Sequence, residues 1–193
     1  MDANIEQLEV AARVAGEVIE TLSDHDWELP TPCENWNVRD IIQHLIAGNE
    51  IFAAALLGGP GTLKQTTKDS GDLFTQYQRS VQELLQAFSQ PGALERTVSV
   101  PFGAIPGALA LHLRITELLV HGWDLARATG CEVVFPEDIA ETELVFSRNL
   151  LKSVPPGHAP FGSPQPVADD APAINRLVAL LGRNVADPLG DSR

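Results

Sequence analysis

A glutamate and a histidine stand one helical turn apart in the apolar stretch ITELLVHGWDLARATG. In a helix, residues four apart lie on the same face, so the side chains of Glu117 and His121 would stack along one stripe. Between Ile115 and Leu125 most of the other residues are hydrophobic, which predicts a buried helix. A buried carboxylate is costly without a partner, and a carboxylate beside an imidazole supplies half of the ligand set of a divalent metal ion. This pair is the first candidate for a functional site.

A catalytic metal site normally has three protein ligands and one open position. The best third candidate is His44, a polar residue in an apolar helical segment, flanked by Ile41, Ile42, Leu45 and Ile46. Facing helices of a bundle can bring such side chains together in the core. For two imidazoles and a carboxylate, zinc is the first expectation and nickel the alternative.

Simpler interpretations of the same residues stay open at this stage. Glu117 and His121 could form an intrahelical pair, with Arg114 or Arg127 neutralising the carboxylate, although such pairs usually lie at the surface. His44 taken alone is more typical of a hydrogen-bonded core histidine than of a metal ligand.

Residues near these motifs have open roles as well. Asp124, three residues after His121, could orient the imidazole, or it could act as a cap or pair with Arg127 or Arg39. Cys33 has no obvious base beside it, so packing is favoured over a catalytic thiol. No catalytic or cofactor-binding residue beyond the metal ligands is predicted.

The remaining aromatic and imidazole side chains are interpreted as structural. Core packing is favoured for Trp36 and Trp123, with lining of a pocket as the alternative. His25, His112 and His158 lie outside the motifs and are expected to be structural or solvated.

Hydrophobic periodicity predicts four long amphipathic helices, over about residues 5–22, 38–57, 72–88 and 106–129. A shorter helix over about 136–152 and a final one over about 173–181 follow. Asn37 is expected to cap the second helix, with Asp40 at its third position. The stretch ERTVSVPFG alternates like a short extended segment or an ordered crossover, and is too short for a sheet core.

These elements predict an all-α protein, a four-helix bundle with one long crossover and a short C-terminal helical extension. Residues 1–152 would form the metal-binding bundle. Residues 153–193 would form a Pro/Gly-rich segment and a C-terminal helix packed on the bundle.

Composition narrows the class of protein. The 193 residues are 44% hydrophobic and 20% charged, as in an ordinary globular protein, and the net charge is −13. An acidic surface repels nucleic acid and anionic lipid, so neither is an expected partner. The start MDANIEQLEV lacks the pattern of an export signal, and the two cysteines form no CxxC pair. Free thiols in the cytoplasm are therefore expected.

Two motifs together resemble a known family, the DinB/YfiT-like metalloproteins. The first, PTPCENWNVRDIIQHLIAGN, has the W-x-V-x-x-x-x-x-H pattern at Trp36, Val38 and His44, and the second, TELLVHGWDLARATG, has E-x-x-x-H at Glu117 and His121. Within the family, the chain looks most like the N-terminal domain of mycothiol-dependent maleylpyruvate isomerase and its actinobacterial relatives. The resemblance runs from about Leu8 to Thr129, and it implies that His44, Glu117 and His121 are the metal ligands, with water completing the site.

The resemblance also implies an activity. It suggests a metal-dependent thiol transferase or isomerase, in which mycothiol or a similar thiol attacks a small electrophile, and it suggests a homodimer. The isomerase has a separate C-terminal domain that contributes to its active site, whereas this chain has about forty residues there. A non-catalytic module that binds a metal or a small molecule is the competing prediction.

Overall fold

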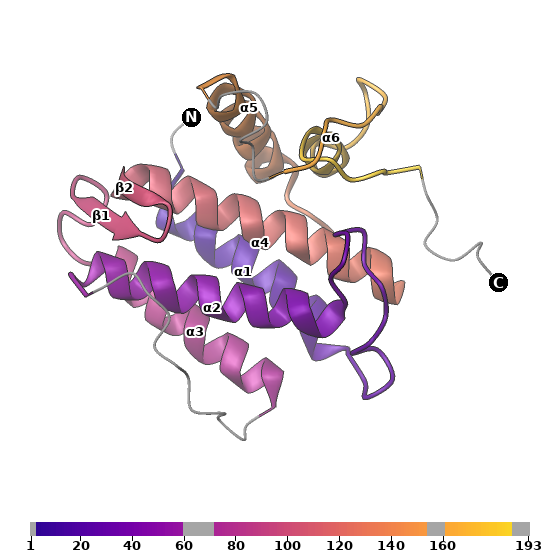
Figure 1. Ribbon diagram of the computed structural model, residues 1–193, viewed down its shortest axis with the longest axis horizontal. Helices are drawn as coiled ribbons and strands as arrows, with labels where there is room; N and C mark the ends of the chain where they lie inside the picture. The colour runs from indigo at the N-terminus through magenta and orange to yellow at the C-terminus, as the bar shows by residue number, and fades with distance from the viewer. Residues whose placement is uncertain (1–2, 60–71, 154–160, 187–193) are drawn as a thin grey trace.

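The computed structural model describes residues 3–59, 72–153 and 161–186, and its described part is mostly helical (Figure 1). These described residues form six helices and one two-stranded antiparallel sheet. In chain order the elements are α1 (Ile5–Glu20), α2 (Val38–Leu56), α3 (Leu73–Phe88), β1 (Thr97–Val100), β2 (Gly103–Pro106), α4 (Gly107–Thr129), α5 (Glu137–Ser153) and α6 (Ala173–Leu180).

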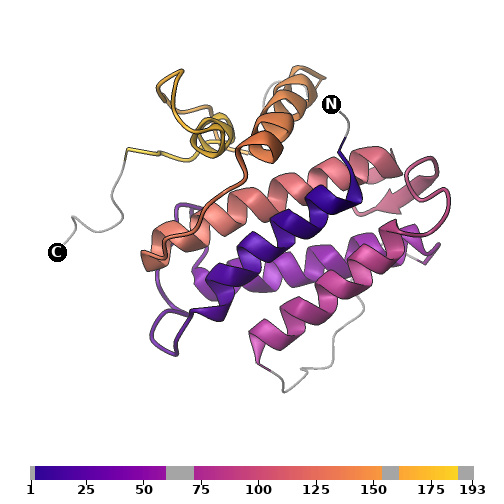
Figure 2. The ribbon, with the colours of Figure 1, turned by 180° about the vertical axis from the view of Figure 1, so that it is seen from behind.

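The four long helices α1 to α4 pack into one body. Helices α1 and α2 each contact both α3 and α4, and the hairpin contacts α2 and α4. Helices α5 and α6 pack against each other and against α4, on the side of α4 away from α3 (Figures 1 and 2). The prediction of an all-α protein is correct in its mostly helical character and in the C-terminal helices that follow the four long ones, but it omits the two-stranded hairpin.

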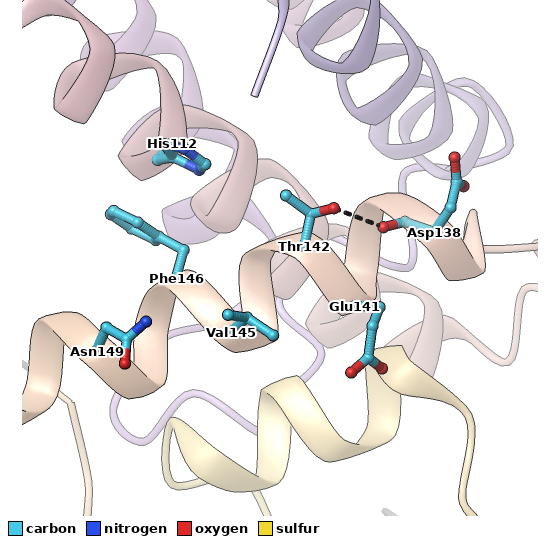
Figure 3. Close-up of a pocket in the computed structure, with 7 residues that line it drawn as sticks. All are labelled: His112, Asp138, Glu141, Thr142, Val145, Phe146 and Asn149. Carbon is cyan, nitrogen blue, oxygen red and sulfur yellow. Dashed lines mark hydrogen bonds between the residues drawn. The ribbon is translucent and has the colours of Figure 1, made fainter. Parts of the chain in front are cut away.

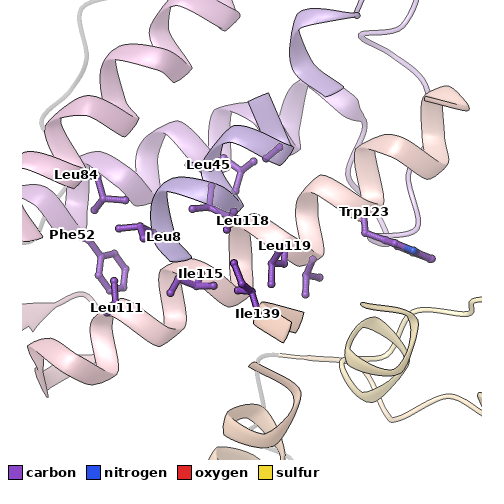
Figure 4. Close-up of a cluster of buried hydrophobic side chains, with 14 of the residues drawn as sticks. Leu8, Leu45, Phe52, Leu84, Leu111, Ile115, Leu118, Leu119, Trp123 and Ile139 are labelled. Atoms are coloured by element: carbon purple, nitrogen blue, oxygen red, sulfur yellow. The ribbon is translucent and has the colours of Figure 1, made fainter. Parts of the chain in front are cut away.

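Apolar stripes from the long helices meet in the centre of this body (Figure 4). Leu8 of α1, Leu45 of α2, Leu84 of α3 and Ile115 of α4 are each completely buried. Burial of such side chains stabilises a fold by about 1.5–3 kcal/mol each. The same packing fixes which face of α2 and α4 points inward, and so it sets the direction of the polar residues on those faces.

The start of α2 is fixed by the cap that the sequence predicts. Asn37 Oδ1 accepts a hydrogen bond from the Asp40 backbone N–H at 2.9 Å, and Asp40 Oδ2 accepts one from the Asn37 N–H at 3.0 Å. This reciprocal pair satisfies two N–H groups that a helix terminus leaves unpaired. It also anchors the helix that carries His44.

The segment between α3 and α4 forms a hairpin, so the extended character of ERTVSVPFG is real but incomplete. Val98 and Val100 of β1 are buried, while β2 is mostly exposed. The register pairs Thr97 with Pro106 and Val100 with Gly103. Alternation is visible in β1 alone, because only β1 has one face on the core.

The C-terminal part docks through polar contacts on α5. Glu137 accepts hydrogen bonds from the Ala173 backbone N–H at 2.9 and 3.1 Å, at the first turn of α6. Arg176 of α6 pairs with Glu141 of α5. His158 and the ranges 154–160 and 187–193 of the predicted C-terminal segment lie outside the described residues. Across residues 3–59, 72–153 and 161–186, the helices lack the combination of length and apolar character needed to cross a bilayer.

Candidate metal centre

Helices α2 and α4 place two of the three predicted ligands, His44 and Glu117, in contact, and the ring of the third, His121, lies near that of His44. His44 Nε2 lies 3.3 Å from Glu117 Oε2, and the centroids of the His44 and His121 rings are 5.1 Å apart. The side chains of His44 and Glu117 keep about a third of their exposure, 35% and 31%, so this cluster lies at the edge of the core.

Glu117 has a second partner, which determines its charge state. Arg114, one turn earlier on α4, donates from Nη1 to the same Oε2 atom that faces His44. Burial by itself would raise the pKa of Glu117, but the Arg114 guanidinium and the His44 hydrogen bond lower that pKa from 4.5 to about 2. The carboxylate is therefore ionised at neutral pH, as a metal ligand must be.

Arg114 is itself completely buried, between α2 and α4. Its Nη2 donates to Asn49 Oδ1 at 2.8 Å, and Asn49 Nδ2 donates to Ser80 Oγ at 3.0 Å on α3. Gly48 provides the space for the guanidinium, because a Cβ at that position would overlap Arg114 Nη1. The interpretation in which an arginine neutralises Glu117 is correct for Arg114, whereas Arg127 lies over the ring of Trp123.

His121 is held by a second buried pair. Asp124 Oδ2 lies 3.0 Å from His121 Nδ1, and Arg183 binds the same carboxylate through Nη2 at 2.9 Å and Nε at 3.3 Å. Since a carboxylate can only accept, His121 Nδ1 carries the proton and Nε2 is the nitrogen left for another ligand. Of the roles considered for Asp124, orientation of the imidazole is therefore the one that the geometry supports.

Two residues of the loop before α2 border the imidazoles. The Trp36 ring centroid lies 4.7 Å from that of His44 and 5.7 Å from that of His121. Trp36 therefore borders the site and is not only core packing. The Cys33 Sγ atom lies within 4.8 Å of a ring nitrogen of His121 and of a carboxylate oxygen of Asp124, all of which could bind a metal ion. Burial raises the pKa of the Cys33 thiol.

The donor set of His44, Glu117 and His121 suits a divalent ion of the zinc class. It combines two imidazoles with one ionised carboxylate, and His121 has the carboxylate partner on its other nitrogen that metal-binding histidines usually have. The cluster of Cys33, His121 and Asp124 is a poorer candidate, because Arg183 and His121 already occupy both Asp124 oxygens.

The groove shown in Figure 3 contains none of the three predicted ligands. It has a volume of about 440 Å³ and is lined by His112, Asp138, Glu141, Thr142, Val145, Phe146 and Asn149. His112 stacks on Phe146, contacts Glu143 Oε1 at 2.9 Å through Nδ1, and accepts from the Ala3 backbone N–H at 3.4 Å. These contacts give His112 the structural role expected from the sequence.

Comparison with known proteins identifies the family. A family model described as the mycothiol maleylpyruvate isomerase N-terminal domain matches residues 8–126. The chain belongs to this family. Two members from Mycobacterium tuberculosis strains, each named only as an uncharacterized protein, are 33% identical to this chain over 161 residues, which cover 81% of this chain and 84% of the relative.

Solved structures agree with the family in fold. The mycothiol-dependent maleylpyruvate isomerase has a TM-score of 0.53 and 17% identity, over 72% of this chain and 65% of the isomerase chain. Its histidine-to-alanine mutant has a TM-score of 0.55 over the same shares. A DinB-like protein from Bacillus subtilis has a TM-score of 0.55 and 16% identity, over 68% of this chain and 95% of its own. At these identities the likeness shows the fold alone.

The sequence analysis missed Arg183 as a component of the site. Helical spacing relates residues three or four apart, whereas Arg183 is 59 positions from Asp124. A lone arginine after an apolar helix carries no signal of its partner.

Proposed function

We propose that this family member binds a divalent metal ion through His44, Glu117 and His121 and acts as a thiol transferase or isomerase on a small electrophile. The observation that supports the proposal is the 3.3 Å contact between His44 Nε2 of α2 and the ionised Glu117 Oε2 of α4, with the His121 ring centroid 5.1 Å from that of His44. Zinc is the expected ion and nickel the alternative. The thiol would be mycothiol or a similar compound, as the name of the related isomerase suggests.

The bound ion would stabilise the deprotonated form of a thiol at neutral pH. The chain's own residues prepare the site for it. Glu117 is kept ionised by Arg114, His121 is oriented by Asp124, and Trp36 lies against both imidazole rings. An aromatic wall excludes water from one side of the imidazoles, which strengthens electrostatic interactions there.

A non-catalytic role is the competing function, and one observation favours it. Arg114 already pairs with Glu117, so the carboxylate is satisfied without a metal ion. In that case the chain would be a binding module for a metal or another small molecule, with the polar cluster serving as a structural tie between α2 and α4.

Metal content tests the first part of the proposal. We expect the purified wild-type protein to hold about one equivalent of metal ion, and His44→Ala and His121→Ala to hold almost none while remaining folded, because the core around them is largely hydrophobic. His112→Ala is the matched control, since His112 lies outside the cluster and should leave the metal content unchanged. Equal metal in all four proteins by elemental analysis would exclude these ligands.

Activity tests the second part. Wild-type protein with zinc should consume small electrophiles in a thiol-dependent reaction, and complete chelation should stop the reaction. Conjugation that continues after chelation would rule out a metal-dependent mechanism. Metal binding without any thiol-dependent turnover over a panel of electrophiles would favour the non-catalytic module.

The proposal includes a homodimer and a division of the chain into a metal-binding bundle over 1–152 and a packed segment over 153–193. Sedimentation equilibrium would give about twice the chain mass of 20.8 kDa for a dimer. A mass equal to that of one chain would exclude the dimer and leave the metal site unaffected.

A further inference from the structure

The residue that connects the C-terminal segment to the candidate metal centre is Arg183. It follows α6, is 7% exposed, and makes a two-point contact with Asp124 of α4, which is completely buried. Its third nitrogen, Nη1, donates to the Leu181 carbonyl oxygen at 3.0 Å. The fork of a guanidinium matches a carboxylate in this way and fixes the position of both groups.

The backbone after α6 is shaped to deliver this side chain. Gly182 has a φ of +95°, which favours glycine, and a Cβ there would overlap the backbone of Gly162. The Arg183 N–H then donates to the Val178 carbonyl oxygen at 2.9 Å. This turn at the end of α6 places the guanidinium against α4.

The contact continues from Asp124 to the metal cluster. Asp124 Oδ2, the oxygen that accepts from Arg183 Nη2, also faces His121 Nδ1 at 3.0 Å. A carboxylate held on one side by a guanidinium has a fixed direction in which to accept the imidazole N–H. This contact fixes the orientation of the His121 ring, and in the neutral ring it places the proton on Nδ1 and leaves Nε2 to bind a metal ion.

We infer that Arg183 is a positioning residue for His121, acting through Asp124, so that the segment after α6 sets the geometry of the metal centre. The inference rests on the proposed metal site for its consequence. Docking alone does not require an ion pair at this place, because apolar side chains of the same volume can stabilise a buried contact as well.

Zinc affinity and the tautomer of His121 together test the inference. Arg183→Met should weaken zinc binding about 10–100-fold, which is the usual effect of losing a partner of a metal-binding histidine. Competition with a chromophoric chelator measures this. In the metal-free variant, long-range ¹H–¹⁵N spectra should show that His121 no longer has the single Nδ1–H tautomer of the wild type.

Two further variants keep the test decisive. Arg176→Met is the matched control, because Arg176 lies in α6 but pairs with Glu141 of α5; it should keep wild-type zinc affinity and tautomer. Arg183→Lys keeps the charge without the fork. It should lose several-fold in affinity, and it replaces Arg183→Met if that variant does not fold.

Three results would overturn the inference. The first is wild-type affinity and tautomer in the Arg183 variants, and the second is an equal loss in Arg176→Met, which would indicate loosened docking. The third is a loss of zinc affinity in Cys33→Ser without a loss in the Arg183 variants, which would place the ion at Cys33. Absence of zinc binding in the wild type would remove the proposed function, while the tautomer in the metal-free protein would still decide the role of Arg183.

Discussion

Glu117 serves two partners with one oxygen atom. Arg114 and His44 both contact its Oε2, so the carboxylate is anchored and ionised before any ligand arrives. The Glu117 side chain can stay paired through Oε2 while its other carboxylate oxygen binds a further ligand. A preformed, ionised carboxylate loses little entropy when it binds an additional cation, which is an advantage for a metal ligand.

The ionisation of Glu117 predicts a pH dependence of stability in the metal-free protein. The pKa of Glu117 is lowered in the folded state from 4.5 to about 2. Its contribution is therefore complete above about pH 4.5 and is lost as the pH falls toward 2. Because the side chain is 31% exposed and solvent screens it, we expect a contribution of about 1–3 kcal/mol at pH 7.

Urea unfolding of wild type and Glu117→Gln, both treated with chelator, measures this contribution. The variant should be less stable at pH 7, since it leaves Arg114 without its counter-ion, and the difference should shrink steadily between pH 4.5 and pH 3. Comparison of the two proteins at each pH cancels the titration of the other carboxylates. A difference that does not change with pH would contradict the assignment.

The residues of the site divide by how far apart their partners lie in the sequence. Helical spacing predicts that Glu117 and His121 share one face, and His44 is recognised as a polar residue among apolar ones, while their role as metal ligands stays a prediction. Trp36 could not be assigned to the site, since an aromatic residue before a helix cap packs into a core just as well. Its position depends on how the loop folds against α4.

At the scale of helices, the approach of α2 to α4 depends on Gly48, a residue without a side chain. Arg114 of α4 inserts its guanidinium over Gly48 of α2, and a Cβ at position 48 would meet it. The absence of a Cβ at Gly48 leaves room for Arg114 to reach both Asn49 and Glu117. Helix packing and the charge of the site are therefore linked at this position.

We expect Gly48→Ala to destabilise the protein by about 1–3 kcal/mol, the usual cost of overpacking. The gain in helix propensity, about 1 kcal/mol, offsets only part of this cost. Gly16→Ala is the matched control: it is also within a helix, and its Cβ would only touch Tyr77 at 3.4 Å. Chemical denaturation should show Gly16→Ala as neutral or stabilising. Equal effects of the two substitutions would show that the Arg114 contact is unimportant.

The helices could be predicted almost to the residue because each has its own local signals. An apolar stripe and the Asn37–Asp40 cap define α2, and Gly130, which has a φ of +71°, ends α4. The hairpin could not be predicted in full, because the residues of β2, Gly103–Pro106, show no alternation. The pairing of β2 depends on β1 and on α4, which are not local features.

At the scale of the whole molecule, the C-terminal layer and the helical body meet along α4. Helix α4 carries Glu117 and His121 of the candidate metal centre. It also carries Asp124, which binds Arg183 of the C-terminal layer, so both layers contact the same helix. The surface remains strongly acidic, with a net charge of −13. Weak, unspecific binding of cations to such a surface is expected, and a test of the metal centre must separate it from binding at the three ligands.

Linkage between metal binding and global unfolding provides that separation. A ligand that binds only the folded state stabilises it by about 2.7 kcal/mol when its free concentration is 100 times the dissociation constant. Wild-type protein should therefore unfold at a higher temperature with zinc than with chelator. His121→Ala should show no such gain, because one of the three ligands is missing.

His112→Ala is the control for this measurement. Its ring contacts Glu143 and Phe146 and is not among the proposed ligands, so the variant should start from a lower unfolding temperature and still gain the wild-type increment with zinc. Zinc that stabilises His121→Ala as much as the wild type would be binding elsewhere, for instance to surface carboxylates. The increment, and not the absolute unfolding temperature, is therefore the quantity that distinguishes a specific centre from the acidic surface.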